Sequence, residues 1–138
     1  MESPKYTRTR DRSTSDPGPR HSRKVEPSDL VGNWVNTDKE TPGISRLVLT
    51  NIDGTLTVRV FGACCPEPCD WGEVKTSIYS IGVDSQRAVG FKAYYDFQFM
   101  ETVLAAYLNK RILVVDSYNV FKDESGRARY FWRDHFHQ

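Results

Sequence analysis

The sequence predicts an all-β protein built as a single eight-stranded antiparallel up-and-down barrel, with a two-layer β-sandwich as the alternative. From residue 30 onward, short segments with an apolar residue at every second position follow one another to the end of the chain. Several links between these segments are short and carry Gly, Asn or Asp, which suits hairpins. Consecutive strands joined by short turns usually pair, and closing them into a barrel removes the exposed edges of a flat sheet.

Three strands are expected before the cysteine-rich loop: Leu30–Asn36, Ile44–Thr50 and Thr55–Phe61. The third alternates cleanly, with Leu56, Val58 and Val60 on one face and polar residues on the other. Asp53-Gly54 precedes it and is a strong hairpin signal, because both residue types tolerate a positive φ. This half of the chain therefore predicts a three-stranded meander.

Five strands are expected after that loop: Trp71–Ser80, Arg87–Phe97, Phe99–Leu108, Arg111–Phe121 and Ala128–Phe136. The links Asn109-Lys110 and Lys122–Arg127 have hairpin lengths, and Gly126 can adopt a positive φ. Helical spacing competes with the strand pattern only near Phe99–Leu108, which contains two adjacent alanines. The two halves together give the eight strands.

The first 28 residues differ in composition from the rest of the chain. Residues 1–26 contain seven Lys or Arg against four acids, and residues 1–28 have almost no large apolar side chains. Such a segment cannot bury enough surface to offset the loss of chain entropy. We therefore expect a disordered basic tail over residues 1–28 and a barrel domain over residues 29–138.

Charge and hydropathy restrict the function classes. Outside the tail, twelve basic residues stand against fourteen acidic ones, so the body of the protein lacks the electrostatic signature of nucleic-acid binding. No apolar run of about 18 residues and no secretory signal are visible, so we expect no membrane span and a cytoplasmic location. Secretion is the alternative if the chain is processed and Cys64 and Cys69 are oxidised.

The segment Leu30-Val31-Gly32-Asn33-Trp34-Val35-Asn36 carries a resemblance to the calycin barrels. Gly32-Asn33-Trp34 resembles the Gly-x-Trp motif of lipocalins, in which the tryptophan plugs one end of the barrel and an arginine of the last strand packs across it. The resemblance implies that Trp34 seals the barrel and that Gly32 is structural. It also implies a cation–π contact to the Trp34 ring from Arg133 or Arg129.

Two further likenesses extend beyond this motif. Leu30–Val60 is similar to the opening of avidin-type proteins, which run Gly-x-Trp-x-Asn, a loop, a second strand and a Gly-led third. The later tryptophan motifs of a biotin site have no counterpart here, so biotin binding is not implied. The span from Trp34 to His137 resembles small bacterial barrel domains with a Cys-x4-Cys-Asp-Trp-Gly loop. Neither likeness implies a particular ligand or reaction, and no cofactor is expected.

The loop from Cys64 to Trp71 holds all three cysteines of the chain. A structural zinc site needs four ligands, and neither a fourth cysteine nor a nearby histidine is present, so no metal site is expected. In an oxidising environment the loop favours a disulfide from Cys64 or Cys65 to Cys69, with one cysteine left over. In a reducing environment the three are free thiols in a turn. A catalytic cysteine would need a base, and the chain has only three histidines.

His135 and His137 are the other candidate metal ligands. They lie two positions apart on a predicted strand and therefore share a face, where a third ligand would complete a metal site. The adjacent carboxylate, Asp134, lies on the opposite face of that strand. We therefore expect a solvated pair of histidines.

Asp116 is the most unusual residue of the predicted strands. It is expected to share a face with Ile112, Val114, Tyr118 and Val120. A carboxylate on an apolar face must be paired or hydrogen-bonded if it is buried. Two interpretations remain open, which are an ion pair to an arginine of a neighbouring strand and a polar anchor inside a ligand cavity.

Three functions follow from these patterns. The leading hypothesis is a small-molecule binding protein that holds an apolar or amphipathic ligand in the barrel. The expected ligand contacts are Trp34, Trp71, Tyr95, Asp116, Tyr118 and Trp132. One alternative is a barrel-fold isomerase or cyclase that uses Asp116 with Tyr95 or Tyr118 as acid–base groups. The other is a protein-interaction module with a filled core. Any self-association is expected to be weak.

Overall fold

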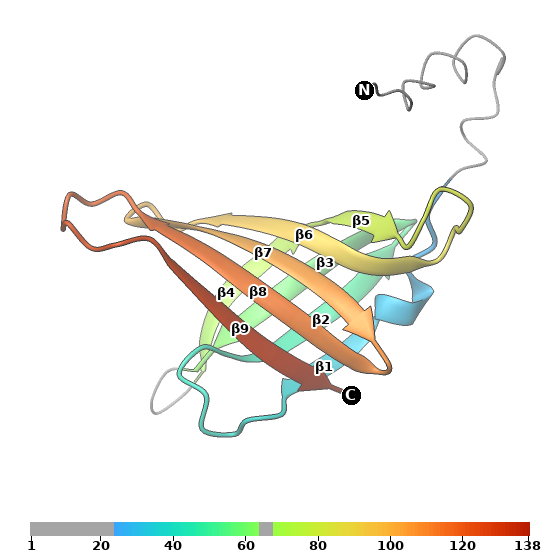
Figure 1. Cartoon of the computed structure of the whole chain (residues 1–138), viewed down its shortest axis with the longest axis horizontal. Coiled ribbons are helices and arrows are strands. Elements are labelled where there is room, and N and C mark those ends of the chain that lie inside the picture. The colour runs from blue at the N-terminus through green and yellow to red at the C-terminus, as the bar shows by residue number, and fades with distance from the viewer. Residues whose placement is uncertain (1–23, 64–67) are drawn as a thin grey trace, which may run out of the picture.

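In a computed structural model of the chain, residues 24–63 and 68–138 are described, and they form one antiparallel sheet rolled into a nearly closed barrel (Figure 1). The strands are β1 (Gly32–Asn36), β2 (Ile44–Ile52), β3 (Thr55–Gly62), β4 (Cys69–Lys75), β5 (Ser77–Ser80), β6 (Ala88–Asp96), β7 (Met100–Asn109), β8 (Ile112–Phe121) and β9 (Tyr130–His137). A 3-10 turn, η3 (Ser28–Leu30), precedes β1. The alternation of apolar residues thus predicted an all-β antiparallel meander correctly, including β7, where helical spacing competed.

The structure has nine strands, so the expected number of eight is wrong. The segment predicted as one strand, Trp71–Ser80, is divided between β4, which pairs with β3, and β5, which pairs with β6. The chain changes neighbours at Thr76, whose backbone N–H donates to the carbonyl of Leu56 at 3.0 Å. Because all nine strands belong to one sheet, the two-layer sandwich is excluded.

The order of the strands in the sheet is β4-β3-β2-β1-β9-β8-β7-β6-β5. Strand β1 joins the two halves of the meander, because it pairs with β2 on one side and with the last strand, β9, on the other. The two edges of the sheet are β4 and β5, which are consecutive in the chain. The opening in the barrel wall therefore lies where β4 passes β6, and the two are not hydrogen-bonded as neighbouring strands.

Side chains alternate between the interior and the outer surface along each strand. In β8 the buried residues are Leu113, Val115, Ser117 and Asn119. In β9 they are Asp134 and Phe136, which occupy the even-numbered positions. This phase decides which of the predicted site residues can reach a cavity in the barrel.

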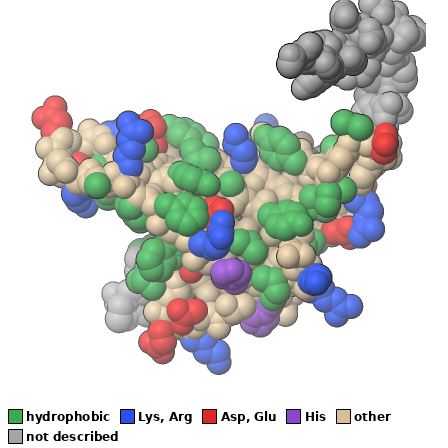
Figure 2. Space-filling model, viewed as in Figure 1, with side chains coloured by type: hydrophobic (Ala, Val, Ile, Leu, Met, Phe, Trp, Pro, Cys, Tyr) green, Lys and Arg blue, Asp and Glu red, His purple; other side chains and the backbone are tan. Residues whose placement is uncertain are grey.

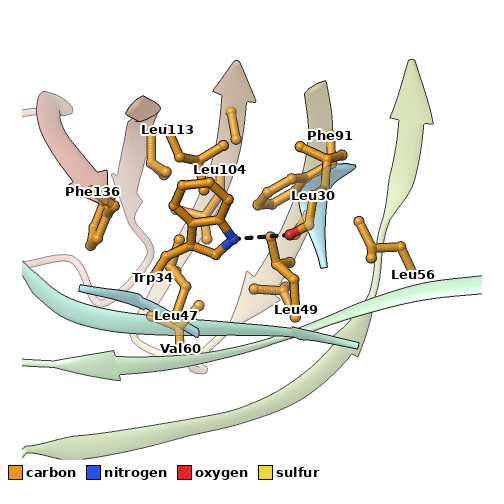
Figure 3. Packing of buried hydrophobic residues seen from close by; sticks show 14 of the residues in the cluster. Leu30, Trp34, Leu47, Leu49, Leu56, Val60, Phe91, Leu104, Leu113 and Phe136 are labelled. Carbon is orange, nitrogen blue, oxygen red and sulfur yellow. Dashed lines mark hydrogen bonds between the residues drawn. The ribbon is translucent and has the colours of Figure 1, made fainter. Parts of the chain in front are cut away.

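The interior is filled by a single cluster of buried apolar side chains (Figure 3). Ten of its members are labelled there: Leu30, Trp34, Leu47, Leu49, Leu56, Val60, Phe91, Leu104, Leu113 and Phe136. They come from η3 and from strands on all sides of the barrel. Leu30, in η3, covers one end of the barrel, which we call the sealed end, and it is fully buried.

The predicted tail falls mostly outside the described residues, since residues 1–23 are not among them. Within residues 24–28, Val25 packs against the core and Glu26 forms an isolated parallel bridge with Arg87. Gly32 begins β1 with φ +145, a backbone conformation that side chains with a Cβ rarely adopt. The side chain of Gln138 also occupies the space that a Cβ at Gly32 would need.

Candidate functional site

A pocket of about 290 Å³ lies at the end of the barrel opposite Trp34. We call it the mouth pocket. It is lined by Pro42, Gly43, Ile44, Trp71, Met100, Ser117, Asn119, Tyr130 and Trp132. These residues come from β2 and the loop before it, and from β4, β7, β8 and β9, so the pocket is formed by the closure of the sheet. Two of the predicted ligand contacts, Trp71 and Trp132, meet here.

Each of these tryptophans lies against a glycine that makes room for its ring. A Cβ added to Gly43 would come within 2.7 Å of the Trp132 indole nitrogen, and one added to Gly62 within 2.8 Å of the Trp71 indole nitrogen. Trp71 lies at an irregularity in the pairing of β3 with β4, followed by Gly72 at φ +92. Such bulges redirect a side chain, and this one places Trp71 against the pocket.

Two polar side chains of the pocket, Ser117 and Asn119, come from β8. The Asn119 amide is held in place, because its oxygen accepts a hydrogen bond from the Thr102 hydroxyl at 2.6 Å. Its nitrogen also donates to the Tyr130 carbonyl at 3.4 Å. Ser117 lines the pocket, and its hydroxyl makes no hydrogen bond within the described parts of the chain. The pocket therefore combines aromatic walls with the Ser117 hydroxyl, which is open to a ligand.

A buried carboxylate fixes the β1–β2 loop beside the mouth pocket. Asp134 accepts hydrogen bonds from the Thr41 hydroxyl at 3.1 Å and from the Ile44 backbone N–H at 3.2 Å. Asn36 fastens the same loop, because its side-chain nitrogen donates to the Ile44 carbonyl at 2.8 Å. These bonds hold Gly43 against Trp132, so the shape of the mouth depends on residues that lie far apart in the sequence.

Tyr95, another predicted ligand contact, is buried at the opening between β4 and β6. Its hydroxyl donates to the Gly72 carbonyl at 2.7 Å, and its ring stacks on Phe97 with centroids 5.6 Å apart. Trp71 packs edge-on against both rings. Burial raises the pKa of the Tyr95 hydroxyl, so it stays protonated and keeps donating. This aromatic cluster joins β4 to β6 where no ladder of backbone hydrogen bonds does so.

Trp34 lies at the sealed end and is 2% exposed. Its indole N–H donates to the Leu30 carbonyl at 2.9 Å, so the ring packs against η3 (Figure 3). A second concavity, of about 810 Å³, adjoins this end. Its lining includes Trp34 itself and the charged residues Asp29, Arg87, Lys110 and Arg111. Trp34 is therefore far from the mouth pocket and does not share a site with Trp71 and Trp132.

Asp116 and Tyr118 point away from the interior, and the expectation that they line a cavity is wrong. The reason is the phase of β8, in which the odd-numbered residues face inward. The Asp116 carboxylate forms a two-point ion pair with Arg133 of the neighbouring strand, at 2.6 and 2.9 Å. This confirms the ion-pair interpretation of Asp116. Of the two acid–base pairs proposed for an isomerase or cyclase, Asp116 with Tyr95 is not assembled, since Tyr95 is inside the barrel and Asp116 is outside it. Asp116 and Tyr118 share the outer face of β8, where Tyr118 is 49% exposed.

Arg133 does not pack across Trp34, so that expectation is also wrong. It lies on the outer face of β9, next to Asp116 and 5.5 Å from the centre of the Phe131 ring. The hydrogen bond to Asp116 raises the pKa of the Arg133 guanidinium. The carbonyl of Leu30 serves as the polar partner of Trp34 instead. No cation–π contact to Trp34 involves Arg129 or any other residue in the described ranges.

The remaining predictions concern the cysteines and histidines. Cys64 and Cys65 lie outside the described residues, so the disulfide to Cys69 stays a prediction. His135 and His137 both lie on the outer face of β9 and are exposed. Among residues 24–63 and 68–138, no group of three or more His, Cys, Asp or Glu side chains could hold a metal ion. The same ranges contain no helix long and apolar enough to cross a membrane.

No protein-family model, curated protein or solved structure matches this chain. The fold by itself defines the class of protein, which is a nearly closed antiparallel up-and-down barrel of nine strands. Its candidate function depends on the geometry of the mouth pocket alone.

Of the nine residues that line the mouth pocket, only Trp71 and Trp132 were predicted from the sequence. The seven others are Pro42, Gly43, Ile44, Met100, Ser117, Asn119 and Tyr130. Ser117 and Asn119 carried a usable signal, because they are the polar residues in register with Leu113 and Val115 on the inward face of β8. From the sequence, this face of β8 could be recognised as the inward one only if Asp116 was known to lie on the outer surface. Gly43 carried no such signal, since its role depends on the position of Trp132.

Proposed function

We propose that the protein binds a small, planar, largely apolar molecule in the mouth pocket, with a polar atom of the ligand bound to the Ser117 hydroxyl. The observation that carries this proposal is the convergence of Trp71, Trp132 and Tyr130 around that open hydroxyl. Aromatic side chains supply a large contact area with few rotatable bonds, and a few placed polar groups then fix the orientation of a ligand.

The volume of the pocket limits the size of the ligand. Ligand sites commonly measure about 300–1,000 Å³. The mouth pocket, at about 290 Å³, lies at the lower end of that range and suits a bicyclic ring system better than a lipid chain. The filled core supports the same limit, because Leu104, Phe91 and Phe136 occupy the space into which a long ligand would extend.

Trp132 is the contact residue that separates binding from stability. Its side chain is 39% exposed, whereas most core residues are almost fully buried. Its indole N–H makes no hydrogen bond within the described part of the chain and can donate to a ligand acceptor. Truncating Trp132 should therefore remove one wall and one donor of the pocket while leaving the core intact.

The test compares two probes of the same shape, quinoline with one acceptor nitrogen and naphthalene with none. Binding to the purified chain is measured by ligand-observed NMR and by titration calorimetry. We expect quinoline to bind more tightly by about tenfold, the value of one hydrogen bond to a neutral group. Ser117→Ala should reduce this preference, and Trp132→Ala should weaken the binding of both probes.

The matched control is Tyr79→Ala, which removes a similarly exposed aromatic side chain from β5, outside the pocket. It should leave the affinity for both probes unchanged. Binding of neither probe to the wild-type chain, or equal loss of binding in Tyr79→Ala and Trp132→Ala, would overturn the proposal.

A further inference from the structure

The outer face of β6, β7, β8 and β9 carries a cluster of half-exposed aromatic side chains, which we call the aromatic outer face. Tyr94, Tyr107, Tyr118 and Phe131 are between 46% and 50% exposed. Val103, Ala105 and Val114 lie between them in the register of the sheet. In Figure 2 hydrophobic side chains gather over these strands, with charged groups and histidine between them. The outer face of β3 and β4 differs, since it presents Arg59, Asp70, Glu73 and Lys75.

The apolar surface in this cluster can be compared with the largest patch on a typical monomer, which measures about 300–600 Å². A fully buried aromatic side chain removes about 150–250 Å² from water, so four half-exposed rings offer on the order of 400 Å². The aliphatic neighbours bring the face to about 500 Å². Two such faces in contact would bury about 1,000 Å², which is the lower limit for a specific protein–protein interface.

The charges at the centre of the aromatic outer face are self-complementary. Asp116 and Arg133 lie opposite each other in the register of β8 and β9, and Tyr118 and Phe131 form the adjacent row. Consider a two-fold axis that lies between the outer faces of two copies, parallel to the strands and above the line between β8 and β9. Rotation about this axis leaves each pair of opposite residues at the same position along the strand direction. It therefore places Asp116 of one copy against Arg133 of the other, and Tyr118 against Phe131, in both directions.

The polar atoms of the ion pair can make these additional bonds. The Arg133 guanidinium has five N–H groups and donates two of them to Asp116. Each carboxylate oxygen of Asp116 can also accept more than one hydrogen bond. A second copy would thus convert two isolated pairs into a ring of four alternating charges. Tyr118 and Phe131 form the row on one side of this ring, and Val114 and His135 form the row on the other. Tyr118 and Phe131 already pack edge-on within one copy, with centroids 5.3 Å apart, and would extend that packing across the interface.

We propose that two copies of this chain form a symmetric dimer through the aromatic outer face, with Asp116 and Arg133 paired across the two-fold axis. The small area is typical of a weak, reversible dimer. The mouth pocket stays open in the dimer, because it is lined from the interior of the barrel. Failure of this proposal would therefore leave the ligand proposal unaffected, and the reverse also holds.

The experiment is a charge exchange between copies, read by analytical ultracentrifugation of the full chain at about 5–500 µM. The wild-type chain should shift from monomer to dimer over that range. Asp116→Arg and Arg133→Glu each place four like charges at the interface and should weaken the dimer at least about tenfold. An equimolar mixture of the two variants restores opposite charges between copies, so it should recover dimers that contain one chain of each kind.

Controls separate the interface from the fold. The pair Arg59 with Asp70 on β3 and β4 is also a two-point ion pair, and Asp70→Arg should leave the dimer unchanged. Circular dichroism establishes that the charge variants fold, and Tyr118→Lys gives a second test of the interface at an exposed position if one of them does not. A wild-type chain that stays monomeric throughout the range would overturn the proposal. Single variants that dimerise like the wild type, or a mixture that stays monomeric, would also overturn it.

Discussion

Trp34 and Trp132 both point into the barrel, yet they lie at opposite ends and have different environments. Trp34 is 2% exposed and hydrogen-bonded to a backbone carbonyl, whereas Trp132 is 39% exposed and borders an open pocket. The sealed end is covered by η3, and within residues 24–63 and 68–138 no helical turn covers the mouth in this way. The comparison teaches that the same residue type on the same face stabilises the core at one end and is available for binding at the other.

The largest expected effect is at the sealed end. Trp34→Ala removes a fully packed ring and leaves the Leu30 carbonyl without its donor, so we expect a loss of about 3–5 kcal/mol in the free energy of unfolding. Urea denaturation followed by circular dichroism measures this loss. Trp132→Ala should cost far less in the same measurement. Equal losses of unfolding free energy in Trp34→Ala and Trp132→Ala would contradict the difference in packing between the sealed end and the mouth.

The next effect concerns the carboxylate that fastens the loop of the mouth. Asp134→Ala leaves the Thr41 hydroxyl and the Ile44 N–H without their acceptor, and we expect a loss of about 1–3 kcal/mol. Hydrogen exchange of the Ile44 amide should accelerate more than that of the core strands. Asp70→Ala, at an exposed position on β4, is the control and should have a smaller effect on stability. Unchanged exchange at Ile44 would contradict the role given to Asp134.

A third prediction concerns Tyr95, which joins β4 to β6 near the mouth. Tyr95→Phe keeps the ring and removes the hydrogen bond to Gly72, so a loss of about 1 kcal/mol is expected. Because burial raises the pKa of Tyr95 in the folded state, its hydroxyl contributes stability below the ordinary tyrosine pKa of 10.0. That contribution is lost as the pH rises above that value towards the folded-state pKa. Alkaline denaturation should thus be shallower in Tyr95→Phe than in the wild type, and identical pH profiles would contradict the assignment.

The last prediction concerns Gly43→Ala, whose new Cβ would lie within 2.7 Å of both the Trp132 indole nitrogen and an Asp134 oxygen. Because the mouth is partly open, the Trp132 ring can shift, and the affinity for quinoline should fall more than the stability does. A change in tryptophan fluorescence reports that shift. Gly82→Ala is the control, because nothing lies within 4 Å of its added Cβ. If both variants bind quinoline like the wild type, Gly43 does not shape the pocket.

Much of the fold could be predicted from the sequence, because alternation of apolar and polar residues directly reports a half-buried strand. Strands β1 to β3 and β6 to β9 begin and end within two residues of their predicted bounds. The division of Trp71–Ser80 into β4 and β5 could not be predicted. Its alternating pattern continues through Thr76, and the change of neighbours there depends on how the whole sheet rolls up.

The candidate site was predicted less well, and β8 shows why. Its two faces are both apolar, with Ile112 and Val114 on one and Leu113 and Val115 on the other. Alternation gives the period of a strand but does not tell which face is buried when both are apolar. The choice of Asp116 over Ser117 as a pocket residue followed from that ambiguity.

The sequence by itself determined that this chain forms antiparallel strands and that Trp34 and Trp132 belong to their apolar pattern. Local periodicity and turn chemistry are sufficient for this, since each acts within a few neighbouring residues. Only the tertiary structure decided which face of β8 is inside, which end of the barrel is covered by η3, and that Gly43, Trp71 and Trp132 line one pocket. Those outcomes depend on pairing between distant strands, which determines the environment of a side chain without changing its local sequence.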